Sequence, residues 1–216
     1  TSRVRIARNL SGSPFVHRAN HEQCQAVAEE IRNAAECAEL PGAPVWIDLS
    51  EISNRHRRVL YERHIISRQH AEGKHPRGVI VDEDETTSIM VNEEDHVRMH
   101  MIAPGLQTDH CFEHVRSIDR SLESKLPWAF HQRFGYLAAC PSNVGTGVRF
   151  SAMLHLPALS LTGDLKKVQN AANDLKLAVR GYYGEGSESS GNFFQISNQV
   201  TLGCSEEELL EQFQQV

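Results

Sequence analysis

Residues 87–102, with the sequence TSIMVNEEDHVRMHMI, place a cluster of carboxylates between two segments typical of β-strands. Residues 97–102 alternate between apolar and polar side chains, as a strand with one buried face does. Residues 87–92 also have the composition of a strand. Strands usually exclude clustered charge, so the three carboxylates at positions 93–95 indicate a site that awaits a cation.

Apolar periodicity extends this interpretation to the rest of the chain. Helical spacing predicts helices over residues 21–40, 53–67, 109–126, 165–181 and 205–216. Further strands are predicted over residues 45–50, 78–82, 134–140, 148–157 and 193–202. Ser53 is a candidate N-cap, and Ser205 with Glu208 forms a candidate capping box. Because the strands come in runs with helices between them, we expect an α+β fold with a largely antiparallel sheet, in one domain over residues 1–216.

Composition excludes several classes of protein. The chain of 216 residues is 40% hydrophobic and 23% charged, which is ordinary for a globular domain. Its net charge of −6 gives no case for binding nucleic acid or an anionic membrane, and no apolar run is long enough for a transmembrane helix. The five cysteines lack a C-x-x-C spacing, which argues for a reducing compartment such as the cytoplasm. His96 and His100 stand four apart, but on a predicted strand that spacing does not favour a zinc site.

Several arginines occupy positions where solubility alone does not require them. They lie in or beside predicted strands and glycine-rich loops: Arg3, Arg5, Arg98, Arg149 and Arg180. Guanidinium groups bind phosphate oxygens in a bidentate manner and keep their charge, so the set could hold a polyphosphate. Scattered surface arginines explain the spacing equally well. The P-loop, protein-kinase glycine-loop and G-x-S-x-G motifs are absent from the sequence.

Four blocks of the sequence resemble the catalytic domain of the guanidino kinases, the superfamily of the arginine and creatine kinases. The blocks are SRVRIAR, VNEEDHVR, CPSNVGTGVR and VRGYYGEGSES, in that order. The segments ERHIIS, DEDETTSIMVNEEDH, HLPAL and GNFFQISNQVTLG are most similar to the bacterial branch that acts on arginine in proteins. The resemblance implies a curved antiparallel sheet flanked by helices. It also implies transfer of the γ-phosphoryl group of ATP, with Mg²⁺ held by phosphates and water rather than by a protein site.

The resemblance also assigns roles to individual residues. Glu94 and Glu185 are similar to the carboxylates that grip the substrate guanidinium, and Cys140 to the thiolate beside it. His64 is similar to the histidine that packs on adenine, although on a predicted helix it could be an ordinary surface residue. The positions that resemble the family's nucleotide contacts are Ser2, Arg3, Val4, Arg5, His64, Arg98, Arg149, Phe150, Ser151, Ala152, Met153, Arg180, Gly181, Tyr182, Tyr183, Gly184 and Glu185.

Other assignments stay open at the level of sequence. Cys140 alone could be a small buried hydrophobe. Glu93 or Asp95 could orient neighbouring groups or a metal-bound water, and residues 184–191 could be a lid or a plain linker. Tyr183 departs from the metabolite kinases, which have an arginine there.

The ends of the chain and the branch assignment bear on the function. The chain starts at the SRVR block without an initiator Met, so we expect a fragment that lacks the family's small N-terminal domain and a C-terminal region. That C-terminal region could serve a homodimer or a regulatory partner. The main hypothesis is a kinase for arginine side chains of proteins. The alternatives are a metabolite kinase for free arginine or a related guanidine, and an inactive module that binds nucleotide or phosphoarginine.

Overall fold

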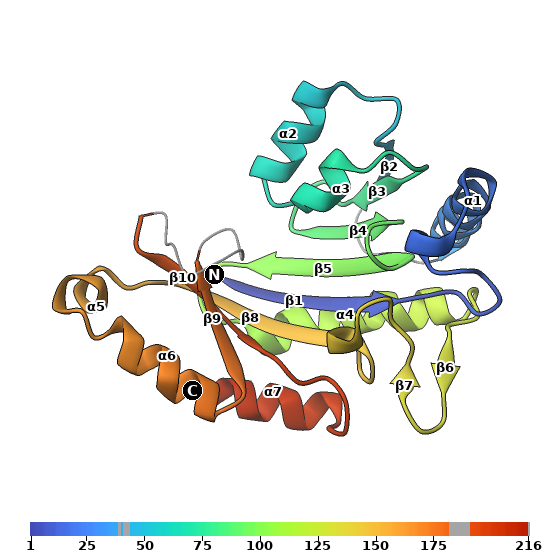
Figure 1. The fold of residues 1–216 in the computed structure, drawn as a ribbon. Helices are drawn as coiled ribbons and strands as arrows, with labels where there is room; N and C mark the ends of the chain where they lie inside the picture. Colours follow the sequence, from blue (N-terminus) through green and yellow to red (C-terminus); the bar gives the residue numbers. More distant parts are fainter. Residues whose placement is uncertain (39, 41–43, 182–190, 216) are drawn as a thin grey trace.

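An eight-stranded antiparallel sheet forms the centre of the molecule, as drawn in the computed structural model (Figure 1). The structure describes residues 1–38, 40, 44–181 and 191–215. Within them the strand order is β2-β3-β4-β5-β1-β8-β10-β9. The strands are β1 (Ser2–Arg8), β2 (Val45–Asp48), β3 (Gly78–Val81), β4 (Thr87–Val91), β5 (Val97–Ala103), β8 (Val148–His155), β9 (Leu177–Gly181) and β10 (Phe193–Asn198). A separate hairpin pairs β6 (Phe130–His131) with β7 (Gly135–Tyr136). The predicted α+β class with an antiparallel sheet is confirmed.

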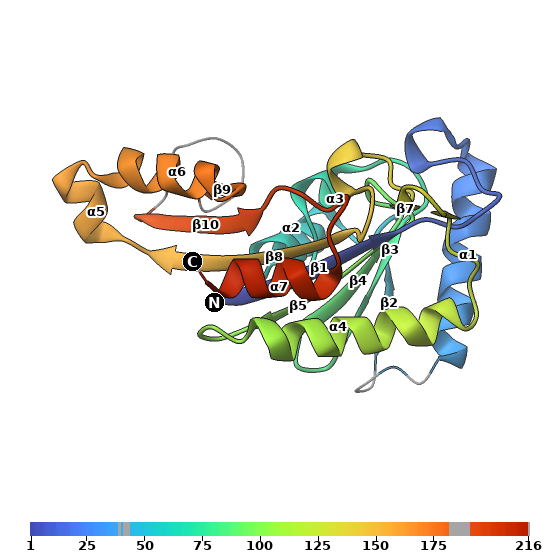
Figure 2. The ribbon, with the colours of Figure 1, turned by 90° about the horizontal axis from the view of Figure 1, so that it is seen from below.

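Helices cover the two faces of the sheet unequally. One face carries α1 (His21–Cys37), α4 (Thr108–Glu123) and α7 (Glu206–Gln214). The other face carries α2 (Asn54–Glu62) and α3 (Arg68–Glu72), which pack beside β3 and β4 (Figure 2). The remaining helices are α5 (Pro157–Thr162), α6 (Leu165–Asp174), and the short 3-10 turns η1 (Val16–Arg18) and η2 (Pro141–Asn143). We call the first face the helix side and the second the cleft side.

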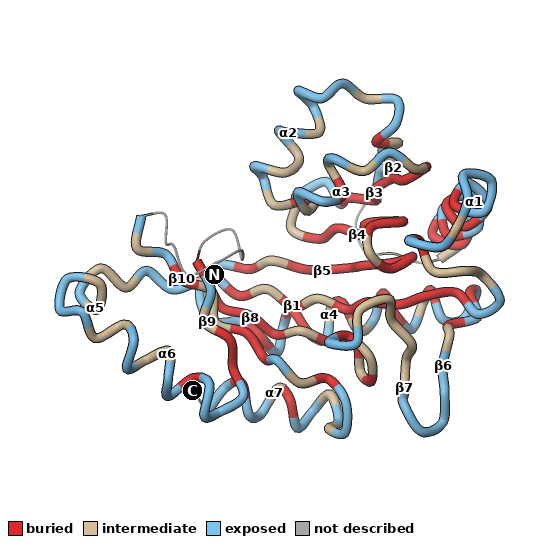
Figure 3. Tube along the Cα trace, in the orientation of Figure 1, coloured by how far each residue is buried: buried red, intermediate tan, exposed pale blue. Residues whose placement is uncertain are grey.

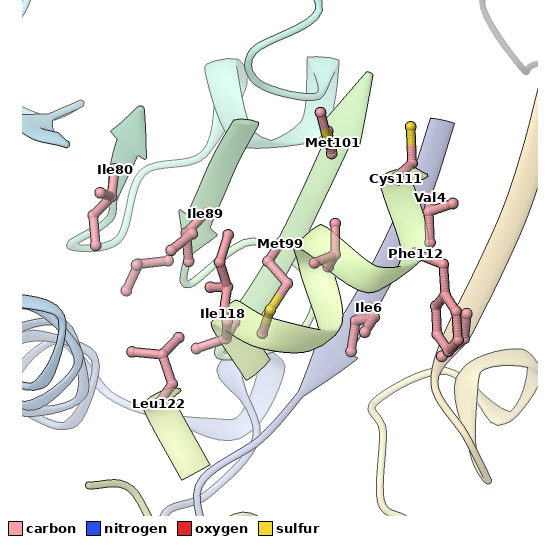
Figure 4. Packing of buried hydrophobic residues seen from close by; sticks show 14 of the residues in the cluster. Val4, Ile6, Ile80, Ile89, Met99, Met101, Cys111, Phe112, Ile118 and Leu122 are labelled. Carbon is pink, nitrogen blue, oxygen red and sulfur yellow. The ribbon is translucent and has the colours of Figure 1, made fainter. Parts of the chain in front are cut away.

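Alternation along the strands explains why the two sides differ. On β1, Val4 and Ile6 point to the helix side, where they join Ile118 and Leu122 of α4 in the main core (Figure 4). Arg3 and Arg5, which alternate with them, point to the cleft side. The strand period of two therefore gives one chain segment an apolar face and a charged face. Burial is concentrated in the central strands, whereas α2 and α5 are largely exposed (Figure 3).

Three predicted elements differ most from the structure. The helix expected over residues 165–181 stops at Asp174, Lys176 adopts a positive φ of 57°, and the last five residues become strand β9. Pairing with β10 buries Leu177 and outweighs the helical spacing. The helix expected over 53–67 ends at Glu62, and His64 (φ 61°) lies in the following turn rather than on a helix. Of the strand expected over 134–140, only Gly135–Tyr136 is formed.

The predicted helix starts are confirmed by their caps. The Ser53 side chain accepts a hydrogen bond from the backbone N–H of His56. Ser205 and Glu208 form the reciprocal pair of bonds of a capping box at the start of α7. Within the described residues, no helix has the length and apolar character needed to cross a membrane.

Candidate active site

A deep cleft of about 1220 Å³ opens on the cleft side of the sheet. Its floor consists of the outward-facing residues of β1, β5, β8 and β10, and the turn after α2 contributes to its wall. The charged and histidine side chains that line it are Arg3, Arg5, His64, Arg68, Glu93, Glu94, Arg98, Arg149 and Arg180. All five arginines that could hold a polyphosphate thus line one cleft.

Strand register brings the arginines close together. Arg5 of β1 lies directly opposite Arg149 of β8, and Arg98 lies on the neighbouring β5. Like charges on adjacent strands repel each other. The pKa of Arg5 is accordingly well below its usual range because of burial, with further lowering by Arg98, Arg3 and Arg149. The pKa of Arg3 is lowered to about 10 by burial and by Arg98.

Four of these arginines have no carboxylate partner among the described residues. Arg3, Arg5, Arg149 and Arg180 take part in none of the ion pairs found there. The Nε atoms of Arg3 and Arg149 are buried and have no hydrogen-bond partner in the described part of the chain. Buried donors without acceptors are costly, so such a cluster suits an anionic ligand with several oxygens. The donor set fits the phosphates of a nucleotide.

The acidic turn between β4 and β5 binds the fifth arginine. Arg98 forms an ion pair with Glu93 and donates a hydrogen bond to Glu94, each at 2.6 Å. Glu93 is buried and also accepts from Ser67 Oγ at 2.5 Å. Burial would raise the pKa of Glu93, but Arg98 and the hydrogen bonds from Ser67 and the Glu94 backbone lower it overall. Glu94 keeps 35% of its side chain exposed, so Glu93 orients Arg98 while Glu94 still has a side open to the cleft.

Cys140 directly precedes the η2 turn, whose Ser142 and Asn143 line the cleft. Its side chain is half-buried, and Sγ lies 3.1 Å from Ser142 Oγ just before β8. The pKa of Arg149 is lowered by burial, Arg180 and Arg98, and the proximity of Cys140 and Glu94 opposes that shift. Both predicted catalytic groups among the described residues therefore lie within electrostatic range of Arg149.

Two histidines, His64 and His100, lie near Arg3. His64 lines it from the turn after α2, and burial together with Arg3 lowers its pKa. His100 of β5 lies with Nδ1 3.2 Å from an amino nitrogen of Arg3. Because burial holds the pKa of His100 well below its usual range, its ring is neutral and accepts this bond. His100 thereby orients Arg3.

The predicted nucleotide contacts fall into three groups. Ser151 and Met153 of β8 line the cleft with the arginines, and Gly181 ends β9. Four side chains do not face the cleft, because strand alternation turns them to the helix side: Ser2, Val4, Phe150 and Ala152. Any contact that these four make with a ligand in the cleft would be through the backbone. Tyr182, Tyr183, Gly184 and Glu185 lie outside the described residues.

Sequence reasoning missed two residues that line the cleft, Ser67 and Asn143, and the buried His100 beside Arg3. Ser67, which donates to Glu93, is the last residue of the helix predicted over 53–67 and of the ERHIIS segment, but the sequence assigned it no role. His100 was considered only as part of a metal pair, although its place in the alternation of β5 indicated the same face as Arg98. Asn143 belongs to the quoted CPSN block, so its presence there was the available signal. No three His, Cys, Asp or Glu side chains of the described ranges are grouped to hold a metal ion.

Comparison with known proteins agrees with this arrangement. The model of the family "ATP:guanido phosphotransferase, C-terminal catalytic domain" matches residues 26–216. A protein-arginine kinase from Pelotomaculum thermopropionicum is 48% identical over 213 residues, 97% of this chain and 60% of that protein. A protein-arginine kinase from Desulforamulus reducens is 45% identical over 214 residues, 98% of this chain and 60% of that protein. The chain thus spans about 60% of the length of these relatives.

Solved structures with the same fold are also guanidino kinases. A taurocyamine kinase from Schistosoma mansoni with bound transition-state-analogue components superposes with a TM-score of 0.89 at 26% identity, over 99% of this chain and 32% of that one. A lombricine kinase superposes with a TM-score of 0.81 at 25% identity, over 98% of this chain and 62% of that one. The sequence blocks, the sheet and the arginine-lined cleft all agree with the family match: this chain belongs to the ATP:guanido phosphotransferases and corresponds to their C-terminal catalytic domain.

Proposed function

We propose that this domain transfers the γ-phosphoryl group of MgATP to a guanidinium nitrogen of arginine residues in proteins. The observation that carries the proposal is the set of four arginines in one cleft without a carboxylate partner among the described residues, next to the partly exposed Glu94. The four arginines can bind a polyphosphate, and Glu94 can bind a guanidinium. Relatives at 45–48% identity bear the name protein-arginine kinase, which supports a protein acceptor over a free guanidine.

The arginines would bind and orient the phosphates. Arg3, Arg5 and Arg149 point into the cleft from neighbouring strands, and Arg98 and Arg180 flank them. Phosphoryl transfer is accelerated mainly by position and by fixed positive charge around the transferring group. MgATP, when bound, supplies the phosphoryl group. Its metal ion would be held by phosphate oxygens and water, as Mg²⁺ commonly is, and needs no protein cage.

Glu94 would prepare the acceptor. An arginine guanidinium has a pKa above ~12 and is a poor nucleophile until a base orients it and takes a proton. Glu94 can accept hydrogen bonds from the guanidinium and receive that proton. We assign the same role to Glu185 on the strength of the sequence motif, and to Cys140 a place beside the acceptor. We also place the reaction in the cytoplasm, in keeping with five free thiols.

Acceptor preference tests the proposal. Purified protein is incubated with MgATP and either a loosely folded arginine-rich protein or free L-arginine, and acid-labile phosphate on nitrogen is measured. We expect a much higher kcat/KM for the protein acceptor. Comparable values would assign the chain to the metabolite kinases. ATP binding without transfer to any guanidine would identify it as an inactive binding module.

A further inference from the structure

The buried carboxylate of Asp95 connects two parts of the candidate site. Asp95 is fully buried between Glu94 and the start of β5. Its Oδ1 accepts hydrogen bonds from the Ala139 backbone N–H at 2.7 Å and from Asn9 Nδ2 at 2.8 Å. Its Oδ2 accepts from Asn143 Nδ2 at 3.4 Å. Its nearest cation, Arg98, is 4.0 Å away and is already bonded to Glu93 and Glu94.

These bonds join neighbours of both catalytic candidates. Asp95 follows Glu94 in the chain, and Ala139 precedes Cys140. Asn143 ends the 3-10 turn after Cys140, and its backbone N–H donates to the Cys140 carbonyl at 3.0 Å. We infer that Asp95 is a positioning residue that fixes the loop bearing Cys140 against the turn bearing Glu94. The inference rests on the proposed function only in treating those two groups as parts of one site.

The chemistry of the partners explains why a carboxylate is needed. Asn9 Oδ1 accepts from the His96 backbone N–H at 2.9 Å, which fixes that amide so that Nδ2 faces Asp95. The Ala139 partner is a backbone donor. Three donors therefore converge on one side chain that can only accept. An amide in place of the carboxylate would turn its own NH₂ toward one of these donors.

The test uses Asp95→Asn, which keeps the shape of the side chain. With its oxygen retained by Asn9 and Ala139, the new NH₂ faces the Asn143 amide and displaces the turn around Cys140. We expect alkylation of Cys140 by iodoacetamide, followed by peptide mass spectrometry, to rise by at least about threefold relative to the exposed Cys37. We expect kcat to fall about tenfold to a hundredfold with ATP affinity within about twofold, because the acceptor side alone is misplaced.

Two further variants separate positioning from general damage. Asp119→Asn removes another buried carboxylate, bonded to Arg8 on the helix side, and should lower the melting temperature without changing relative Cys140 alkylation. The exchange Asp95→Asn/Asn143→Asp gives the new amide an acceptor and should return alkylation toward the wild-type rate. Should Asp95→Asn fail to fold, Asn143→Ala removes one donor alone and should raise Cys140 alkylation by a smaller factor.

The inference is overturned if folded Asp95→Asn retains wild-type alkylation and kcat, if Asp119→Asn exposes Cys140 to the same extent, or if the exchange restores nothing. It is equally overturned if Asn143→Ala leaves Cys140 unchanged. Because the alkylation readout requires no phosphoryl transfer, it remains decisive even if the proposed kinase activity is not found.

Discussion

Arg5 and Arg8 lie three residues apart on strand β1 but on opposite sides of the sheet. Arg8 faces the helix side, is 1% exposed, and donates to Asp119 at 2.6 Å and to the carbonyls of Thr146 and Ala7. The Tyr136 ring lies 3.5 Å from its guanidinium carbon. Arg5 faces the cleft and has other arginines as its charged neighbours, with Glu93 as the weaker opposing charge.

The difference shows how one strand can separate a structural charge from a functional one. The donors of Arg8 are satisfied within the protein, so its charge fixes β1 against α4 and the loop before β8. The charge of Arg5 is compensated only in part, so it reduces stability and remains available to a ligand. An arginine paired with a buried carboxylate thus indicates a structural role. An arginine whose charged neighbours are mainly other arginines indicates a role in binding an anionic ligand.

The largest effect is expected on the cleft side, in Glu94→Gln. The substitution keeps the size of the side chain but removes the proposed base, so turnover should fall by ~10²–10⁴-fold while the protein stays folded. ATP affinity should stay the same or rise, because a negative charge near the phosphates is lost. Phosphotransfer rates, ATP titration and thermal melts measure these quantities.

Glu93→Gln is the matched control for that experiment. Glu93 is buried and bonded to Arg98 and Ser67, so its loss should lower stability more than that of Glu94 and slow turnover less. If Glu93→Gln were the slower enzyme while both variants stayed folded, the proposed base would be the wrong residue of the pair.

Arg8→Ala should give the largest loss of stability. Removing one partner of a buried ion pair leaves Asp119 without compensation, which typically costs about 3–5 kcal/mol of the free energy of unfolding. Arg5→Ala, on the same strand, should leave that free energy unchanged or raise it, because the repulsion from Arg98, Arg3 and Arg149 is relieved. Urea unfolding of both variants measures the contrast. Equal losses would abolish the distinction between the two sides.

The sequence could predict which residues line the cleft side of the sheet, but not the contacts that Arg8 makes on the helix side. Alternation on β1 and β5 is visible in the sequence, and the motif blocks indicate the five arginines and Glu94. Nothing local indicated that Arg8 would meet Asp119, 111 residues away, since that contact depends on how α4 crosses the sheet. The same limitation explains why the last five residues of the helix predicted over 165–181 form strand β9, because pairing with β10 is a tertiary effect.

Arg149→Ala should have an intermediate effect on ligand binding. Hydrogen bonds to charged groups contribute roughly 1.5–3 kcal/mol, so ATP affinity should fall about tenfold to a hundredfold, and turnover should fall with it. Arg58→Ala, which removes an exposed arginine of α2 paired with Glu62, should leave both unchanged. Isothermal titration with MgATP distinguishes the two. An unchanged affinity for MgATP in Arg149→Ala would mean that Arg149 does not bind the nucleotide.

The smallest effect concerns pH and His70 of α3, on the cleft side. Burial lowers the pKa of His70 to about 4, although its hydrogen bond to the Val91 carbonyl and the charge of Glu93 oppose the shift. The folded state thus prefers the neutral ring, so stability is full above the unfolded pKa near 6.5 and is lost as pH falls toward 4. Between pH 7 and pH 5, protonation of His70 should lower the free energy of unfolding by about 2 kcal/mol.

His96 and His100 have lowered pKa values as well, so the test is the difference between wild type and His70→Gln in urea unfolding at both pH values. The variant should lose about 2 kcal/mol less on acidification. Identical losses would mean that protonation of His70 does not account for the loss of stability in acid.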